Sequence, residues 1–496
     1  MPETRLWLPS SFHQQPPSRE EKTVIEAAPC KSEGNVLQPI FDIRAGEWAK
    51  VLPMSLFFFS VIATFWALKP MKRGLFIDYY KQNPFDHFGW HLGGAQTEQL
   101  AKITNVAAAY ALAVFVTWLV RNFSRQQIIS IFCTLFGLGF LAFSVLLDQP
   151  SAPVIWTFYV FGDMFNTVMV MLFWAFLSDI VTTGEAKRLY GVIGLGGVAG
   201  GLFGAFFVAT TVKTMGRDTI LLACLVPMIL ISLIVWWVNR QVEIDHPSVI
   251  GVPAHPECSS FDEGIKLLLE SKYLLSIAGM VILYELVSSI IDFQLSVTVE
   301  AMVPGSMEKT AYFSQVAVIQ GMVSVVAQLV VTSYVMRKFG VGTALLILPM
   351  AIFLGSAGYL IFANLLFVTV LSVSDNSLSY SVNQSARELL YVPTSRCTKY
   401  KAKAIIDMSI QRFSKVLAVV VNLGASWYLS LENVRWLSLV CLAVVMAWFF
   451  LIRYTEHSFQ HMTAETKPIF DRSPHSRTGR SRSSLLIPRN QRYEGE

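Results

Sequence analysis

The chain has 496 residues, of which 53% are hydrophobic and only 15% are charged, and its mean hydropathy is +0.50. Soluble domains carry about 25% charged residues, so this much apolar side chain needs a second environment, which a lipid bilayer supplies. The formal net charge is +5. The composition therefore excludes an ordinary soluble protein and predicts an all-α polytopic membrane protein.

Twelve apolar runs approach the length of about 20 residues that crosses a membrane. In chain order they cover residues 51–68, 101–120, 127–147, 154–181, 190–212, 219–238, 273–292, 311–336, 342–363, 365–390, 405–430 and 434–452. The second run ends in "VTWLVRNFS" (116–124) and the eighth in "VTSYVMRKFG" (331–340), at matching positions. This weak repeat predicts two six-helix halves, as in transporters with parallel repeats.

Polar segments delimit these halves. We expect a disordered cytosolic segment over residues 1–50, halves over 51–238 and 273–453, a central cytosolic loop over 239–272, and a basic disordered tail over 454–496. Lysines and arginines gather in alternate loops, so the positive-inside rule places both termini in the cytosol. The tail is interpreted as a positive-inside anchor rather than a nucleic-acid-binding segment.

The segment "LKPMKRGLF" after the first run breaks the positive-inside rule. Its three cations, Lys69, Lys72 and Arg73, fall on the outer side. Such a violation indicates charges that are held within the protein rather than at the lipid surface.

Other ionisable residues fall inside the predicted spans, where their cost makes them functional by default. They include Asp163 in the fourth span, Asp292 at the end of the seventh and Lys415 in the eleventh. The tenth span is the least apolar, and its polar residues must line a wet cavity or satisfy one another: Asp375, Asn376, Asn383, Gln384, Arg387 and Glu388. For Glu285 and Glu388, ion pairs that lock helices together are an equally good interpretation.

The fifth span, "GVIGLGGVAGGLFGAFF", is rich in glycine. Gly196, Gly200 and Gly204 form overlapping G-x-x-x-G steps, which predict close helix packing. The pattern also imitates a dinucleotide-binding fingerprint, but no strand precedes it. Walker A, C-x-x-C and H-E-x-x-H sequences are missing, and no histidine lies in a predicted span. We therefore expect no metal, no cofactor and no enzyme activity.

Three segments resemble the ATP/ADP translocases, the nucleotide transporters of intracellular bacteria and plastids. They are "FWAFLSDIVTTGEAKRLYGVIGLGG" (173–197), "YSVNQSARELLYVP" (380–393) followed by "KYKAKAIID" (399–407), and "SKYLLSIAGMVILYELVSSIID" (271–292). The resemblance extends from about residue 50 to 454. It implies a major-facilitator-like architecture and places functional charges at Lys69 and Lys72, Asp163, Asp292 and Lys415. Two lysines that are usual in the family fall at Ser296 and Ser379.

We therefore expect a secondary transporter that moves nucleotides, or a related phosphorylated anion, by alternating access in a bacterial inner membrane. Lys69, Lys72, Arg73, Arg387 and Lys415 would bind phosphate. Asp163 and Asp292 would pair with cations in the empty state, with Lys69 and Asp292 as an outer gate. Asn383, Gln384 and Glu388 would line the cavity. The alternatives are a proton-coupled transporter of another solute, with Asp163 or Asp292 carrying the proton, and a membrane scaffold that transports nothing.

Overall fold

The computed structural model describes residues 47–87, 89–181, 183–245, 268–391, 403, 405–428 and 431–470. The predictions for the N-terminal segment, for most of the central loop and for the end of the basic tail concern residues outside this set. Within it, the first half consists of α1 (Trp48–Gln82), β1 (Phe85–His87), β2 (Trp90–Leu92), α2 (Gly94–Asn122), α3 (Arg125–Leu146), α4 (Ala152–Ile180), α5 (Thr183–Ala223) and α6 (Leu225–Asp245).

The second half consists of helices with several π-helical turns. Its elements are α8 (Lys272–Met302), α9 (Ser306–Val326), η3 (Ala327–Thr332), α10 (Ser333–Lys338), α11 (Gly340–Ile361), α12 (Leu365–Leu378), η4 (Ser379–Asn383), α13 (Gln384–Leu390), η5 (Ile406–Ile410), α15 (Gln411–Tyr428), η6 (Leu431–Trp436) and α16 (Leu437–Phe470). The π-helical segments η3 and η4 contact each other. Such turns inside α-helices occur frequently at functional sites.

The predicted spans are occupied by helices. Among the described residues, ten runs are long and apolar enough to cross a membrane. One of them, Arg188–Gln241, contains two predicted spans, and it is broken at Gly216, whose φ of 77° suits glycine. The eleventh span corresponds to the amphipathic helix α15. The prediction of an all-α polytopic fold is confirmed.

Two helices are longer than predicted. α1 continues to Gln82, so Lys69, Lys72 and Arg73 lie within a helix and not in a loop that follows it. α8 continues to Met302, so Asp292 lies inside this helix and not at its end. The predicted spans stopped at these charges because an isolated charge is costly in a membrane, but each helix continues where its charges have partners.

α16 also differs from its prediction. It continues to Phe470, so residues 454–470 are helical and do not belong to a disordered tail. The helix surfaces carry many exposed apolar side chains, among them Val114, Leu329 and Phe450, which are 73%, 71% and 74% exposed. Such a surface matches hydrocarbon rather than water.

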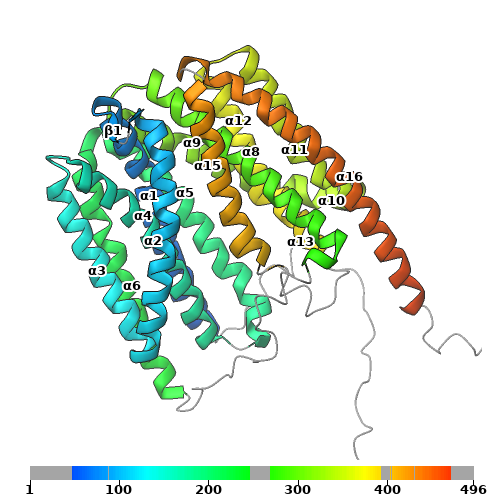
Figure 1. Cartoon of the computed structure of the whole chain (residues 1–496). Coiled ribbons are helices and arrows are strands. Elements are labelled where there is room, and N and C mark those ends of the chain that lie inside the picture. Colours follow the sequence, from blue (N-terminus) through cyan, green and yellow to red (C-terminus); the bar gives the residue numbers. More distant parts are fainter. Residues whose placement is uncertain are drawn as a thin grey trace, which may run out of the picture. The chain divides into compact units, whose positions relative to one another are not determined.

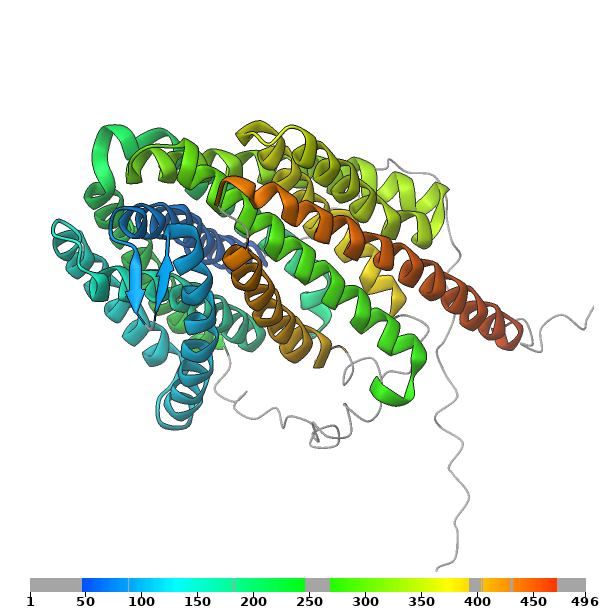
Figure 2. The same ribbon diagram turned by 45° about the horizontal axis from the view of Figure 1, so that its top comes forward.

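Figures 1 and 2 show how the helices are arranged. In the first half α1 packs against α4 and α5, and in the second half α8 packs against α12, α15 and α16. The β1–β2 hairpin marks one end of the bundle, which we call the hairpin end (Figure 1). We call the opposite end, where α1 begins and α16 ends, the tail end.

Candidate functional site

The site is organised by one face of α1. Lys69, Lys72 and Arg73 are spaced at i, i+3 and i+4, so their side chains emerge on the same side of the helix. Pro70 lies between them and removes one backbone donor from the helix. The nonpolar body of α1 is buried at this level, and the three cations are directed into the protein instead of toward lipid.

Lys72 is neutralised within the first half. Its ammonium forms an ion pair with Asp163 of α4 and lies 4.2 Å from the centre of the Tyr159 ring. Lys72 is 4% exposed. The second oxygen of the Asp163 carboxylate accepts a hydrogen bond from the side-chain amide of Asn105 on α2. Three helices of the first half, α1, α2 and α4, are therefore joined at this carboxylate.

Arg73 joins the two halves. Its Nε lies 3.1 Å from Glu98 Oε1 of α2, and its Nη2 lies 2.8 Å from Asp292 Oδ1 of α8. Nη2 also donates to the main-chain oxygen of Asp292 at 3.0 Å and to the hydroxyl of Ser296. The guanidinium carbon is 4.5 Å from the centre of the Phe313 ring on α9. A planar, multidentate donor suits this position between two carboxylates.

A second cation holds Asp292 from α2. Lys102 Nζ lies 2.7 Å from Asp292 Oδ2. Ser296, one turn further along α8, donates to Glu98 Oε2 at 2.7 Å. Glu98, Lys102 and Asn105 are spaced at i, i+4 and i+7, which places them on one face of α2. None of the three was predicted as a site residue: Glu98 precedes the predicted second span, which began at residue 101, and Lys102 and Asn105 lie within its first turns.

The charges of this cluster leave a positive surplus. It contains four cations (Lys69, Lys72, Arg73 and Lys102) and three carboxylates (Glu98, Asp163 and Asp292), so one positive charge is in excess. Lys69 forms no ion pair with any residue that the structure describes. Its ammonium instead lies 4.6 Å from the centre of the Trp66 ring. The cluster therefore presents one cation that has no counter-charge.

This arrangement corrects the predicted gate pair. Asp292 is paired with Arg73 and Lys102, not with Lys69. Lys69 and Arg73 share a helix face but lie one turn apart, a rise of about 6 Å along α1. Arg73, and not Lys69, therefore lies on the turn of α1 that contacts Asp292 of α8.

Further contacts join the halves toward the hairpin end. Lys309 of α9 is fully buried, and its Nζ lies 2.5 Å from Asp78 Oδ1 of α1. The carboxylate of Glu300 accepts from the main-chain amides of Gly94 and Ala95 at 2.8 and 2.6 Å. It thus caps α2, whose N-terminal amides favour a negative charge. These contacts hold the hairpin end of the bundle closed.

Lys415 lies nearer the tail end. Its Nζ is 3.8 Å from Glu285 Oε2, and 56% of its side chain is exposed. Glu285 also accepts from the amide of Gln411 at 2.6 Å. Glu285 precedes Asp292 by seven residues on α8, which separates the two by about 10 Å along the helix. Lys415 is therefore a further cation, more exposed than those of the α1 cluster and displaced from them toward the tail end.

The polar residues after α12 lie further still toward the tail end. Arg387 follows Asp375 by twelve residues, a rise of about 18 Å, and no ion pair to it is present in the described part of the chain. Glu388 is paired with Lys403, with its carboxylate oxygens 2.6 and 2.7 Å from the ammonium. Asn383 is buried, whereas Gln384 is exposed. The structure does not bring these four residues into contact with the α1 cluster.

The glycines of α5 lie directly against α1. A Cβ on Gly196, Gly200 or Gly204 would overlap a main-chain carbonyl oxygen of α1, at Ser55, Phe59 and Ala63 respectively. α1 and α5 therefore approach each other backbone to backbone, which fixes the helix that carries the cations.

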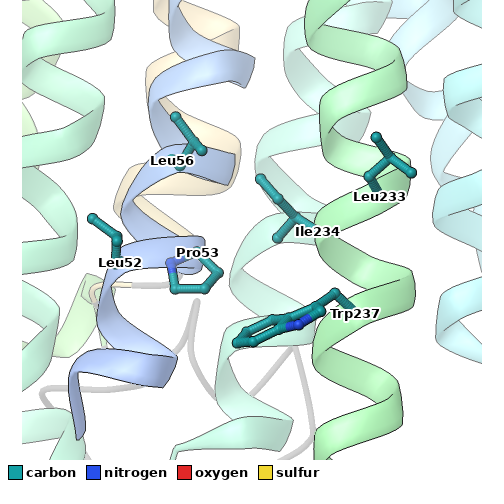
Figure 3. Close-up of a pocket in the computed structure, with 6 residues that line it drawn as sticks. All are labelled: Leu52, Pro53, Leu56, Leu233, Ile234 and Trp237. Atoms are coloured by element: carbon teal, nitrogen blue, oxygen red, sulfur yellow. The ribbon is translucent and has the colours of Figure 1, made fainter.

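An apolar groove lies on another face of α1. It has a volume of about 280 Å³ and runs between α1 and α6 (Figure 3). It is lined by Leu52, Pro53, Leu56, Leu233, Ile234 and Trp237. No ionisable group lines it, so it is unsuited to an anion and lies apart from the site. Among the described residues, no group of three or more histidine, cysteine, aspartate or glutamate side chains is placed to hold a metal.

Two six-helix halves, joined by ion pairs within the spans, give the chain a major-facilitator-like fold. Solved structures with this fold include a POT-family peptide transporter (TM-score 0.58, 11% identity, 82% of this chain and 98% of that one) and a nucleoside transporter variant (TM-score 0.57, 12% identity, 82% and 99%). Residues 154–459 match the sequence profile of the TLC ATP/ADP transporter family. The chain belongs to this family.

Relatives with curated descriptions agree. An "ADP,ATP carrier protein 1" of Chlamydia trachomatis is 24% identical over 486 residues, which cover 84% of this chain and 90% of the relative. A chloroplastic "ADP,ATP carrier protein 1" of Arabidopsis thaliana is 24% identical, over 86% of this chain and 76% of its own length. An "ADP,ATP carrier protein 3" of Rickettsia bellii is 22% identical, over 78% and 89%. These proteins are carriers, so the family resemblance seen in the sequence is confirmed.

Proposed function

We propose that this chain exchanges nucleotides, with ATP and ADP as the reference pair, by alternating access. The observation that carries the proposal is the face of α1, where Lys69, Lys72 and Arg73 lie side by side within the membrane-spanning helix and Lys69 lacks a counter-charge among the described residues. Cations held in a low-dielectric interior attract a multiply charged anion strongly. The names of the related carriers supply the nucleotide as the substrate class.

The ion pairs supply a coupling mechanism. An arriving phosphate first meets Lys69, and its oxygens then replace Asp163 at Lys72 and Asp292 at Arg73. Arginine binds phosphate through two parallel hydrogen bonds, and lysine acts as a point charge. Asp292 bridges the halves through Arg73 and Lys102. When the phosphate takes the place of Asp292 at Arg73, one of the contacts between the halves is lost, so binding favours opening toward the hairpin end.

The loop charges give this cycle an orientation. If both termini lie in the cytosol, as the positive-inside rule predicts, the tail end faces the cytosol and the closed hairpin end faces outward. Lys415, which is largely exposed, and Arg387 would then lie on the cytosolic approach to the cluster. We place the protein in a bacterial inner membrane, where a nucleotide approaches from either side during one exchange cycle.

The proposal is tested with the full chain in liposomes that are loaded with ADP. ATP labelled on the α-phosphate is added outside, with ADP, other nucleotides and sugar phosphates as competitors. We expect uptake that requires internal ADP. K69Q should raise KM by about 10-fold or more, because a hydrogen bond to a charged group contributes about 1.5–3 kcal/mol.

K50Q is the matched control for K69Q. Lys50 lies on the same helix near the tail end, where it pairs with Glu185 at 3.5 Å. Its replacement removes one positive charge from α1 without touching the cluster, so KM should stay within twofold of the wild-type value. The proposal is overturned if no phosphorylated compound enters the liposomes or competes.

A further inference from the structure

Asp375 is the buried carboxyl group that the exchange mechanism leaves unused. It lies in the last turn of α12, just before η4, and is 1% exposed. Its Oδ2 accepts a hydrogen bond from the hydroxyl of Ser288 on α8 at 2.6 Å. Its Oδ1 has no hydrogen-bond partner. Among the described residues, no lysine or arginine forms an ion pair with it.

The other carboxyl groups of the site differ in this respect. Asp163 is paired with Lys72, and Asp292 with Arg73 and Lys102. Both acids that the sequence had offered as proton carriers are therefore paired with cations. Because a cation already neutralises each of them, neither needs a proton to compensate its charge.

The groups around Asp375 are acidic or neutral. The ionisable side chains near enough to interact electrostatically with Asp375 are Tyr284, Glu285 and Asp292 of α8, Tyr380 of η4 and Cys441 of α16. From α9 the nearby polar group is the uncharged amide of Gln320, and the one ionisable residue of α11 over Gly340–Ile361 is Tyr359, whose hydroxyl is hydrogen-bonded to Thr298. None of these groups is a cation. A negative charge on Asp375 would face two further carboxylates.

An unpaired carboxylate in such a place costs several kcal/mol, which protonation avoids. We propose that Asp375 is a proton-binding site that couples exchange to proton movement, an inference that rests on the proposed function. In the hairpin-closed conformation Oδ1 carries the proton and Oδ2 accepts from Ser288. The step is a simple association, in which a carboxylate and a proton taken from water form a neutral carboxylic acid.

The fold connects this site to the gate. Ser288 and Asp292 are four residues apart on α8, so they lie on one face, one turn from each other. A shift of α8 that frees Asp292 also moves the hydroxyl that contacts Asp375. The π-helical segment η4 begins four residues after Asp375, and its Ser379 donates to the hydroxyl of Tyr284 at 2.6 Å. Rearrangement at this junction would hydrate Asp375 and release the proton.

The test uses liposomes that contain the full chain, with labelled ATP exchanged against ADP at equal pH and then under an imposed pH gradient. In the wild type we expect the gradient to change the exchange rate several-fold. D375N cannot take up a proton, so it should exchange at equal pH and ignore the gradient. N376A is the matched control, because Asn376 donates to Ser372 of its own helix, and it should keep the wild-type response.

Infrared spectroscopy gives a readout that does not depend on transport. The wild type at neutral pH should show the carbonyl band of a protonated, buried carboxylic acid, and D375N should lack it. If D375N does not fold, S288A assigns the band, because loss of the donated hydrogen bond shifts its frequency.

The outcomes separate the two proposals. Wild-type exchange that ignores a pH gradient, a response to sodium in place of protons, or a missing carboxylic acid band each overturns the proton site and leaves the proposed function standing. Failure of every nucleotide to exchange at equal pH overturns the proposed function instead, and the infrared band then decides the proton site alone.

Discussion

Replacing Asp292 with asparagine should loosen the hairpin end of the bundle. Asp292 accepts from Arg73 of α1 at 2.8 Å and from Lys102 of α2 at 2.7 Å, so one carboxylate ties α8 to two helices of the other half. Asparagine retains the shape and one carbonyl oxygen but loses the charge. D292N also removes the negative charge that lies between Arg73 and Lys102, so the two cations repel each other more strongly.

The magnitude follows from the number and the exposure of these contacts. A hydrogen bond to a charged group contributes about 1.5–3 kcal/mol. The Asp292 side chain is 35% exposed, so water screens both contacts and the loss should be about 2–3 kcal/mol in all. Since 1.4 kcal/mol corresponds to a tenfold change in an equilibrium constant, the ratio of closed to open hairpin ends should fall by about 30- to 150-fold.

Spin labels on Gln82 and Met307 measure this opening. Both residues are exposed, and they lie at the hairpin ends of α1 and α9, in opposite halves. D292N should add a population at longer distance. D148N is the control, because Asp148 pairs with Arg217 inside the first half at 3.3 Å. An unchanged distance distribution in D292N would refute a gating role for this carboxylate.

A double-mutant cycle then identifies the partner. D292N and R73Q remove the same contact, so their effects on the opening should be coupled by about 1 kcal/mol or more. D292N and K69Q should be additive, because Lys69 does not contact Asp292 in this conformation. Coupling to Lys69 in place of Arg73 would contradict the pairing that the structure shows.

Three further predictions concern the packing around the site. G200A should lower the melting temperature by several degrees, because its Cβ would overlap the Phe59 carbonyl oxygen, whereas G194A, with nothing within 4 Å, should not. K309M leaves the partly buried Asp78 without its cation and should destabilise the fold by about 2–4 kcal/mol, and D78N should restore part of the loss in chemical denaturation. E388Q breaks the ion pair between Glu388 and Lys403, whose side chains are 41% and 34% exposed. The free energy of unfolding should therefore fall by no more than about 1 kcal/mol, and the exchange rate should stay close to that of the wild type.

The sequence predicts the helices well and singles out the three cations, although it placed them after the first span and not within α1. Long apolar runs define the spans, and the i, i+3, i+4 spacing of Lys69, Lys72 and Arg73 sets their common face. It does not predict which of them meets Asp292. That choice depends on how far α8 is displaced along its axis relative to α1, and a shift of about 6 Å exchanges one turn for the next. Packing between the halves, which hydropathy does not encode, fixes this displacement.

The partners on α2 were missed for a different reason. Glu98 lies in the first turns of α2, before the predicted span that began at residue 101, and Lys102 is the second residue of that span, where a charge is typical of a span boundary. In the structure each charge is compensated by one from another helix, Glu98 by Arg73 and Lys102 by Asp292. A charged helix end can therefore lie inside the bundle when its partners come from elsewhere in the sequence. Spacing alone offers one signal, the i, i+4 repeat of Glu98 and Lys102.

The serine at position 379, where the family resemblance leads one to expect a lysine, explains why Asp375 has no counter-charge. Ser379 follows Asp375 by four residues, and an acid four residues before a lysine is the favourable order for an ion pair on a helix. S379K should therefore give Asp375 the cation that its surroundings lack. We expect S379K to keep nucleotide exchange at equal pH, to lose the response to a pH gradient and to lose the carboxylic acid band. S381A is the control, since Ser381 donates to Ser377 of its own chain segment. If S379K retains both the band and the gradient response, the proton is not held at Asp375.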